Sequence, residues 1–134
     1  MRDFAPWSWF VIMLGGAFGT GLRLFLSTWI ALQIGESFPW GTLVVNILGC
    51  FVIGLFGGLT GPDGIFLTSP LMRQAVMIGV LGGFTTFSSF TLQTLSLFSD
   101  GEWLYAAMNI ALSLVLCLTC TWGGDAIARL VQYR

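Results

Sequence analysis

Long apolar runs separated by short polar connectors dominate the pattern of this chain. A helix needs about 20 mostly apolar residues to cross the hydrocarbon core of a bilayer. Four runs are long enough: Trp7–Leu32, Trp40–Thr60, Gln74–Ser99 and Trp103–Gly124. They are continuous rather than alternating, which argues against a transmembrane β-barrel. We therefore expect an all-α membrane protein in which residues 1–134 form a single four-helix transmembrane domain.

Composition supports the same class. Apolar residues make up 56% of the chain and charged residues only 8%, against roughly 25% charged in soluble domains. The five basic residues form no run, so a nucleic acid would find no basic patch to bind. The chain has no histidine. These features exclude an ordinary soluble enzyme and a nucleic-acid-binding module.

The distribution of arginine predicts an orientation in the membrane. Four spans place both termini and the second connector on one side. That side holds Arg2, Arg73, Arg129 and Arg134, so the positive-inside rule places both termini in the cytoplasm. A cleaved signal peptide is the alternative for the first run. Glycines and Arg23 interrupt that run and no clear cleavage site follows, so we expect a retained helix.

The chain contains 18 glycines, more than lipid-facing helices need. Several are spaced four apart, a pattern that lets helix backbones approach closely. The pairs are Gly15 with Gly19, Gly54 with Gly58, and Gly79 with Gly83. Helix packing explains most of them. Four thin helices rarely enclose a pathway alone, so we also expect an oligomer, most simply a two-fold dimer.

Three cysteines lie inside the apolar runs, and Cys117 and Cys120 have the spacing of half a zinc or redox motif. No histidine and no second pair completes such a site. We interpret Cys50, Cys117 and Cys120 as small apolar packing residues.

Polar side chains inside a membrane are costly unless they are paired, so their positions carry information. They are Arg23, Asn46, the hydroxyl residues of 85–89, Gln93, Asn109 and Ser113. No Asp or Glu lies within the four runs. A small proton-coupled exporter needs an intramembrane carboxylate, so its absence disfavours that function.

The third run contains a segment that disfavours a continuous helix. Gly82 and Gly83 are followed by Thr85 and Thr86, and glycine and β-branched residues are poor helix formers. We predict a break there, which would free backbone groups at membrane depth, as in the broken helices that build ion sites. The alternative is a glycine-softened kink whose hydroxyls bond to the preceding turn.

Two kinds of ion fit such a break. Freed carbonyls suit a hard cation such as Na⁺, whereas the Asn46 amide, hydroxyls and N–H groups suit an anion. Phe87 and Phe90 also suit an anion, because an aromatic ring has a positive edge. Ordinary apolar packing is the alternative for this pair.

Polar residues recur at helical spacing on the third and fourth runs, which places each set on one helix face. The sets are Thr85, Ser89 and Gln93, and Asn109, Ser113 and Cys117. Two such stripes facing one another would form a narrow uncharged track that includes Ser113. Interhelical hydrogen bonding alone is the alternative.

Three motifs resemble those of the Fluc/CrcB fluoride channel family. The first run reads Gly15-Gly16-x-x-Gly19-x-x-x-Arg23, and the second reads Gly41-Thr42-Leu43-x-Val45-Asn46-x-x-Gly49. The third reads Gly82-Gly83-x-Thr85-Thr86-Phe87-Ser88-Ser89-Phe90. The similarity extends over essentially the whole chain, and the second and third motifs together are highly specific.

The resemblance implies a multi-pass channel of the cell inner membrane that exports toxic fluoride passively. It implies an antiparallel dual-topology homodimer with two fluoride pores and a central structural Na⁺. The partners would be fluoride, membrane lipid and a second copy of the chain. Carbonyls of Gly82 and Thr85 would hold Na⁺. The fluoride pathway would include Asn46, Phe87, Ser89 and Phe90, with Arg23 at the aqueous vestibule.

Three functions are therefore compared. A fluoride channel is the first, a small proton-coupled multidrug exporter is the alternative, and a membrane subunit without transport activity is the third. Fluoride flux without chloride flux, flux driven by a proton gradient, and no flux at all would distinguish them.

Overall fold

The computed structural model describes residues 6–133, and every regular element in that range is a helix. The elements are α1 (Pro6–Ile34), α2 (Trp40–Leu59), α3 (Pro70–Gln74), the π-helical segment η1 (Ala75–Leu81), α4 (Gly82–Phe84), α5 (Phe87–Ser99) and α6 (Trp103–Gln132). Four stretches are long and apolar enough to cross a membrane: α1, α2, the composite Pro70–Ser99 and α6. The prediction of an all-α, multi-pass membrane protein is confirmed.

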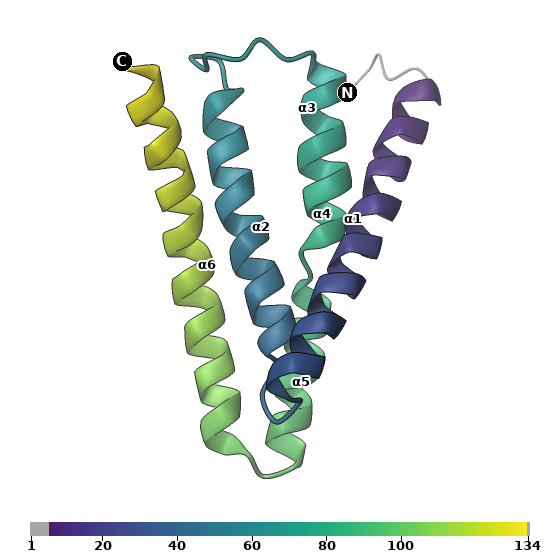
Figure 1. Ribbon diagram of the computed structural model, residues 1–134, viewed down its shortest axis with the longest axis vertical. Helices are drawn as coiled ribbons and strands as arrows, with labels where there is room; N and C mark the ends of the chain where they lie inside the picture. The colour runs from purple at the N-terminus through teal and green to yellow at the C-terminus, as the bar shows by residue number, and fades with distance from the viewer. Residues whose placement is uncertain (1–5, 134) are drawn as a thin grey trace.

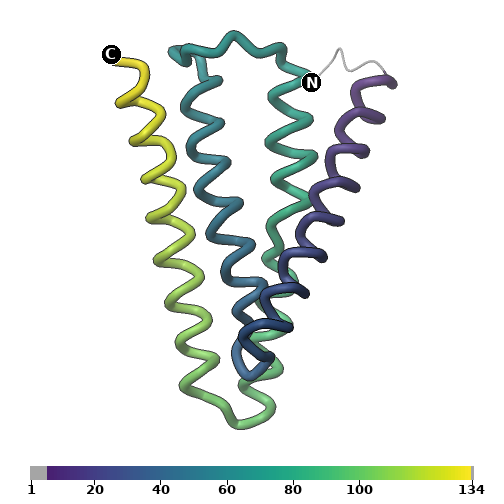
Figure 2. Tube along the Cα trace, in the orientation of Figure 1, coloured from purple at the N-terminus to yellow at the C-terminus, as the bar shows by residue number. Residues whose placement is uncertain are grey.

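The four spans form a bundle that is wider at one end than at the other (Figures 1 and 2). Helix α2 runs beside α6, while α1 crosses the composite third span at η1 and α4. The start of α1, the α2–α3 connector and the end of α6 lie at one end of the bundle (Figure 1). Arg73 and Arg129 therefore share an end, as predicted, whereas Arg2 and Arg134 lie outside the described residues.

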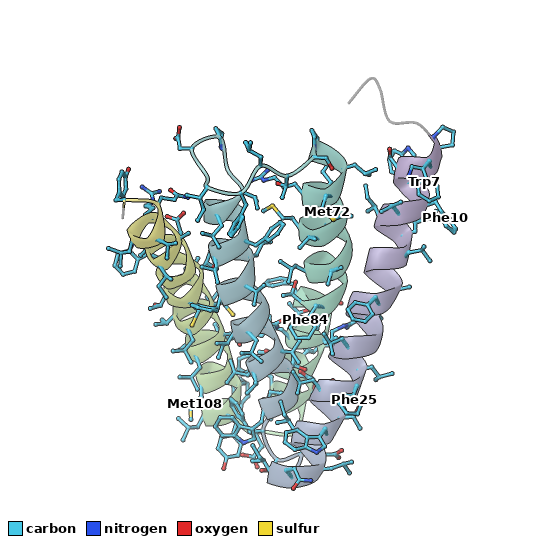
Figure 3. All side chains as sticks on the ribbon, turned by 45° about the horizontal axis from the view of Figure 1, so that its top comes forward. Trp7, Phe10, Phe25, Met72, Phe84 and Met108 are labelled. Carbon is cyan, nitrogen blue, oxygen red and sulfur yellow. The ribbon has the colours of Figure 1, made fainter. Side chains whose placement is uncertain are left out.

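Large apolar side chains point away from the bundle along α1. Trp7, Phe10 and Phe25 are 63%, 50% and 69% exposed (Figure 3). Phe84 lies inside the bundle and is buried. A water-soluble protein would not expose apolar surface on this scale, so these side chains are suited to contact with lipid.

Glycine lets α1 pack directly on the backbone of the third span. A Cβ at Gly15 would lie 2.8 Å from the Ala75 carbonyl oxygen, and one at Gly79 would lie 2.7 Å from the Ile12 carbonyl oxygen. A Cβ at Gly83 would lie only 2.5 Å from the Gly16 carbonyl oxygen. The expectation that these glycines serve helix packing is confirmed for this seam.

A second glycine seam joins α2 to α6. A Cβ at Gly54 would collide with the carbonyl of Thr121, and one at Gly58 would lie 2.6 Å from the Ala128 Cβ. The close approach explains why Ala128 is fully buried near the end of α6.

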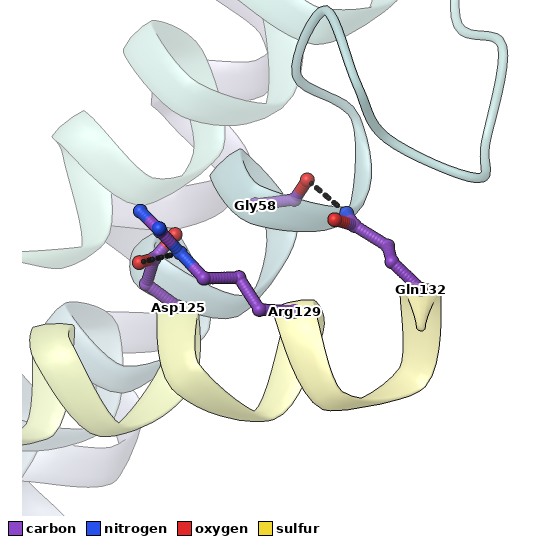
Figure 4. Close-up of polar contacts among 4 residues, drawn as sticks. All are labelled: Gly58, Asp125, Arg129 and Gln132. Carbon is purple, nitrogen blue, oxygen red and sulfur yellow. Dashed lines mark hydrogen bonds and ion pairs between the residues drawn. The ribbon is translucent and has the colours of Figure 1, made fainter. Parts of the chain in front are cut away.

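Helix α6 continues to Gln132, eight residues beyond the predicted end at Gly124. Two polar contacts stabilise this extension (Figure 4). Arg129 Nε donates to Asp125 Oδ2 at 2.8 Å, and Gln132 Nε2 donates to the Gly58 carbonyl at 2.8 Å. The α6 span therefore does contain a carboxylate, but it lies near the helix end and is paired with Arg129.

Candidate functional site

The third span breaks where the sequence predicts it. Thr85 and Thr86 adopt extended backbone, with φ and ψ of −83° and 157° and of −150° and 115°. The helix resumes at Phe87. The Thr85 N–H and hydroxyl both donate to the Leu81 carbonyl at 3.0 Å, which closes the last turn before the break. The helix is interrupted rather than only kinked. The back-bonding that the kink alternative expected is nevertheless present, in the bond from the Thr85 hydroxyl to the Leu81 carbonyl.

The Asn46 side chain of α2 holds this extended segment. Its Nδ2 donates to the Thr86 carbonyl at 3.0 Å, and its Oδ1 accepts from the Thr86 N–H at 2.7 Å. One buried amide thus pairs with both backbone groups of one residue in the break. Because a buried backbone group without a partner is costly, this pair replaces the helical bonds that the break removes.

The break diverts two N–H groups from the carbonyls they would bond in a continuous helix. An α-helical N–H bonds the carbonyl four residues earlier. The Thr86 N–H instead reaches Asn46, and the Ser89 N–H instead reaches Thr86 Oγ1 at 3.1 Å. The carbonyls of Gly82 and Thr85 therefore lose their ordinary helical partners.

These two carbonyls have the chemistry of a cation site. Hard cations take oxygen ligands, and carbonyls at broken helices serve this purpose in membrane proteins. Gly82 is exposed on this single chain. The described residues contain no group of three or more His, Cys, Asp or Glu side chains able to hold a metal.

Thr86 caps the second half of the broken span. Its hydroxyl accepts from the Ser89 N–H and donates to Ser89 Oγ at 3.1 Å, and it lies 3.2 Å from Ser88 Oγ. A threonine at this position satisfies one of the free N–H groups in the first turn of α5. Ser89 is thus fixed beside the break.

The Phe87 and Phe90 rings lie together just after the break. Their centroids are 5.2 Å apart and their planes are inclined by 48°. Phe90 is 7% exposed, whereas Phe87 is 70% exposed on this single chain. One ring therefore belongs to the interior, and the other presents its surface outside the chain.

Helix α6 contacts α5 through a chain of polar groups. Asn109 Nδ2 donates to Thr94 Oγ1 at 2.9 Å, and Thr94 Oγ1 donates to the Phe90 carbonyl at 2.7 Å. One turn along α6, Ser113 is buried and its hydroxyl has no partner among the described residues. This free hydroxyl is available to a ligand that enters the bundle.

The two predicted polar stripes are only partly formed. Thr85 lies in the extended break, so it does not continue the helical face of Ser89 and Gln93. Asn109 bonds Thr94 rather than a member of the predicted stripe. The expectation that Thr85 shares a helix face with Ser89 and Gln93 is therefore wrong, because the break changes the backbone direction between them.

Arg23 and Gln93 make no described hydrogen bond to this cluster. Arg23 is half-buried on α1, and its Nε is buried without a partner in the described part of the chain. Gln93 Oε1 is likewise buried and unpartnered. Gln93 lines a cavity of about 710 Å³ at the connector end of α1 and α5.

That cavity is acidic, since Glu36, Asp100 and Glu102 line it. No arginine lines it among the described residues. Negative charge lowers the local concentration of anions, so this cavity by itself does not attract an anion.

The structure thus brings six of the predicted site residues to one place around the break: Asn46, Gly82, Thr85, Phe87, Ser89 and Phe90. The sequence predictions do not include the bonding roles of Thr86, Thr94 and Thr20. Thr20 Oγ1 lies 3.4 Å from the Gly83 carbonyl, which it bonds across the α1 seam. The role of Thr86 did have a sequence signal. Threonine is a preferred residue immediately before a helix, where its hydroxyl accepts from an N–H of the first turn.

The three cysteines are free and half-buried. Cys50 lies on α2, and Cys117 and Cys120 lie on α6, which packs against α2. Their partial burial on two helices that pack together fits the interpretation as packing residues.

Comparisons with known proteins agree on one family. The model of a family described as CrcB-like protein, Camphor Resistance (CrcB), matches residues 10–125. The fluoride-specific ion channel FluC of Opitutus terrae is 56% identical over 117 residues, which cover 87% of this chain and 89% of that protein. FluC of Rhodospirillum rubrum is 54% identical over 121 residues, covering 90% and 94%. FluC of Methylocella silvestris is 50% identical over 117 residues, covering 87% and 89%.

Proposed function

We propose that this chain, which belongs to the CrcB family, is a fluoride-specific ion channel through which the ion leaves the cell passively. The observation that carries the proposal is the break in the third span. Asn46 bonds the backbone of the extended segment there, and the paired rings of Phe87 and Phe90 follow it. The groups gathered there are amide, hydroxyl, carbonyl and aromatic, and none is ionised. A channel needs binding that is weak enough to release the ion, and such groups meet that need.

The ring edges of Phe87 and Phe90 would contact fluoride, with Ser89 and Ser113 as hydroxyl donors along the pathway. The positive edge of an aromatic ring attracts an anion without forming a strong charge pair. Ser113 supports this assignment because its buried hydroxyl has no partner among the described residues. The second Asn46 amide hydrogen is also available to a passing ion, since Nδ2 carries two hydrogens and makes one described bond.

A second copy would complete the assembly as an antiparallel, dual-topology homodimer in the cell inner membrane. Phe87 and Gly82 are exposed on one chain, and both belong to the proposed functional segment. A two-fold partner would cover them. In this arrangement Arg23 would lie at an aqueous vestibule and attract fluoride.

A structural Na⁺ would lie at the centre of that dimer. The residues present fit it, because the Gly82 and Thr85 carbonyls have lost their ordinary helical partners. When bound, the ion would supply a fixed positive charge that holds the two breaks together. The chain's own contribution would be to hold the backbone around these carbonyls in place, and the pairing of Asn46 with Thr86 supports this role.

Fluoride efflux from liposomes tests the proposed function. Protein in vesicles loaded with potassium fluoride should release fluoride when valinomycin compensates charge, and vesicles loaded with potassium chloride should retain chloride. A protonophore should leave the fluoride rate unchanged. Chloride release at the same rate would contradict the selectivity, and no fluoride release would contradict channel function.

The proton-coupled multidrug exporter is not supported. The relatives compared above are named fluoride channels, and the α6 carboxylate Asp125 is paired with Arg129 near a helix end. That pairing leaves no free carboxylate at mid-span among the described residues.

A further inference from the structure

A cavity of about 290 Å³ lies between the end of α2 and the start of α3. Its polar lining comprises Thr60, Thr68, Arg73 and Gln74. The span before the cavity ends at Leu59, and the span after it begins at Pro70. The cavity therefore lies at a membrane boundary, at the opposite end of the bundle from the acidic cavity.

The cavity carries positive charge. Arg73 is the one charged side chain that lines it among the described residues. The described part of the chain provides Arg73 with no ion pair, whereas Arg129 at the same end is paired with Asp125. A guanidinium without a carboxylate partner is suited to bind an oxyanion through parallel N–H bonds.

Two donors that belong to residues lining this cavity have no partner in the described part of the chain. Arg73 Nε and Thr68 Oγ1 are both buried and have no partner among the described residues. The neighbouring polar side chains are already used: Thr60 Oγ1 bonds the Phe56 carbonyl at 2.6 Å, and Ser69 Oγ accepts from the Met72 N–H. A buried polar group without a partner is costly, so an acceptor that a small side-chain movement brought within reach of these two donors would stabilise this part of the chain.

The cavity is too large for the transported ion. A single fluoride would occupy a small part of 290 Å³ and would leave most of the cavity to water. A phosphate group offers several acceptor oxygens, so it could accept from the guanidinium and from the threonine hydroxyl together.

An exposed apolar segment directly precedes Thr68 in the sequence. Ile65, Phe66 and Leu67 are 47%, 56% and 102% exposed. The connector is folded back on α2, because the Phe66 N–H donates to the Leu59 carbonyl at 3.1 Å. Three consecutive apolar side chains at a membrane boundary are suited to insertion among acyl chains, which places Thr68 and Arg73 at the level of lipid phosphates.

We propose that Arg73 and Thr68 bind a phosphate group in this cavity, and that its source is the headgroup of an anionic phospholipid whose acyl chains contact Ile65, Phe66 and Leu67. The bound lipid would anchor the α2–α3 connector at the membrane surface. This site is separate from the fluoride pathway and does not depend on it.

Thermal unfolding of the purified protein in a neutral detergent tests the site. Dihexanoylphosphatidylglycerol, dihexanoylphosphatidylcholine, inorganic phosphate and sodium fluoride would each be titrated. Ligands that bind the folded state raise the unfolding temperature, so each titration yields an apparent Kd. Arg129→Gln is the matched control for Arg73→Gln, because it removes the same charge from the same end of the bundle.

We expect phosphatidylglycerol to stabilise the parent and Arg129→Gln equally. Arg73→Gln should bind it roughly tenfold to a hundredfold more weakly, the range for a lost hydrogen bond to a charged group. Thr68→Val keeps the charge and the shape of the side chain. It should weaken binding by roughly two- to tenfold, which tests the site even if Arg73→Gln fails to fold.

Three results would overturn the proposal. Equal weakening in Arg73→Gln and Arg129→Gln would show diffuse surface charge rather than a site. Stabilisation by inorganic phosphate at the same concentration, lost in Arg73→Gln, would identify the free ion as the source. Stabilisation by fluoride with the same dependence on Arg73 would place the cavity on the fluoride pathway instead.

Discussion

At the scale of single residues, Asn46 has a structural task that precedes any contact with fluoride. Its amide bonds both backbone groups of Thr86, 40 residues away in the sequence. The need of the Asn46 amide for a partner was predictable from the sequence. Thr86 was not predictable as that partner, because the pairing depends on how α2 packs against the break.

The dual role of Asn46 makes Asn46→Asp a sharp test. A carboxylate can accept from the Thr86 N–H but cannot donate to the Thr86 carbonyl, so one bond becomes a repulsion. The added negative charge also opposes an anion in a low-dielectric site. We expect fluoride efflux from liposomes to fall by about tenfold or more, which corresponds to roughly 1.4 kcal/mol.

Gln33→Glu is the matched control, since it makes the same chemical change at an exposed position of α1. It should leave the efflux rate unchanged. Parent-like efflux in a folded Asn46→Asp protein would contradict a role for Asn46 in the pathway.

The rings of Phe87 and Phe90 are predicted to act through their electrostatics rather than their volume. Ile keeps an apolar side chain of similar bulk but removes the positive ring edge. We expect Phe87→Ile and Phe90→Ile to elute normally on gel filtration and to conduct far less fluoride. Met should retain more activity, because its thioether is polarizable and its chain adapts to the site.

Phe25→Ile on the outer face of α1 serves as the control for these variants, and it should conduct like the parent. If Phe87→Ile and Phe90→Ile also conduct like the parent, the two rings are packing residues and the anion assignment fails.

At the scale of elements, the four spans were predictable because continuous apolar runs of this length have few alternatives. The break was predictable as well, since Gly82 and Gly83 precede two β-branched residues. The π-helical turns at Ala75–Leu81 could not be predicted from the sequence. Their sequence is that of an ordinary apolar helix, and only the structure shows how closely α1 packs on their backbone.

Alanine substitutions at Gly79, which lies in the seam with α1, and at Gly21, which lies outside it, should have opposite effects on stability. Gly79→Ala adds a Cβ that would lie 2.7 Å from the Ile12 carbonyl oxygen and 3.3 Å from the Gly15 Cα. The backbones must separate, so we expect a loss of roughly 1–3 kcal/mol of stability. Gly21→Ala meets no atom within 4 Å and should stabilise the helix by roughly 0.5–1 kcal/mol.

Thermal unfolding in detergent measures both effects of these alanine substitutions. Gly79→Ala should lower the midpoint temperature and Gly21→Ala should raise it slightly. A midpoint for Gly79→Ala at or above that of the parent would show that close backbone contact does not hold α1 against η1.

At the scale of the whole molecule, charge is sparse and unevenly placed. The acidic cavity at one end of the bundle does not attract anions. At the other end, the charge of Arg129 is paired with that of Asp125. Arg23 lies within α1, far from both ends of that helix, and its Nε has no partner among the described residues. We predict that Arg23 attracts fluoride toward the proposed pathway.

Arg23→Gln should lower fluoride efflux most at low ionic strength. The Debye length is about 30 Å at 0.01 M salt and about 10 Å at 0.1 M, so added salt should shrink the difference from the parent. Arg129→Gln is the control and should show little effect at either salt concentration. A loss that is the same at all salt concentrations would indicate a structural role for Arg23 instead.

Sequence alone could not establish assembly. The number of spans follows from the apolar pattern, whereas the second copy is inferred from surfaces such as Phe87 and Gly82 that one chain leaves exposed. Insertion in both orientations would depend on a small arginine bias, and two of the contributing residues, Arg2 and Arg134, lie outside the described range.

The reversal potential of the current in a planar bilayer tests passive fluoride conduction most directly. With a fluoride gradient across the membrane, we predict a reversal potential that shifts by about 59 mV per tenfold gradient of this monovalent ion. It should not respond to an added chloride gradient or to a pH gradient at fixed fluoride activity. A reversal potential that follows the pH gradient, or that shifts equally with chloride, would contradict the account.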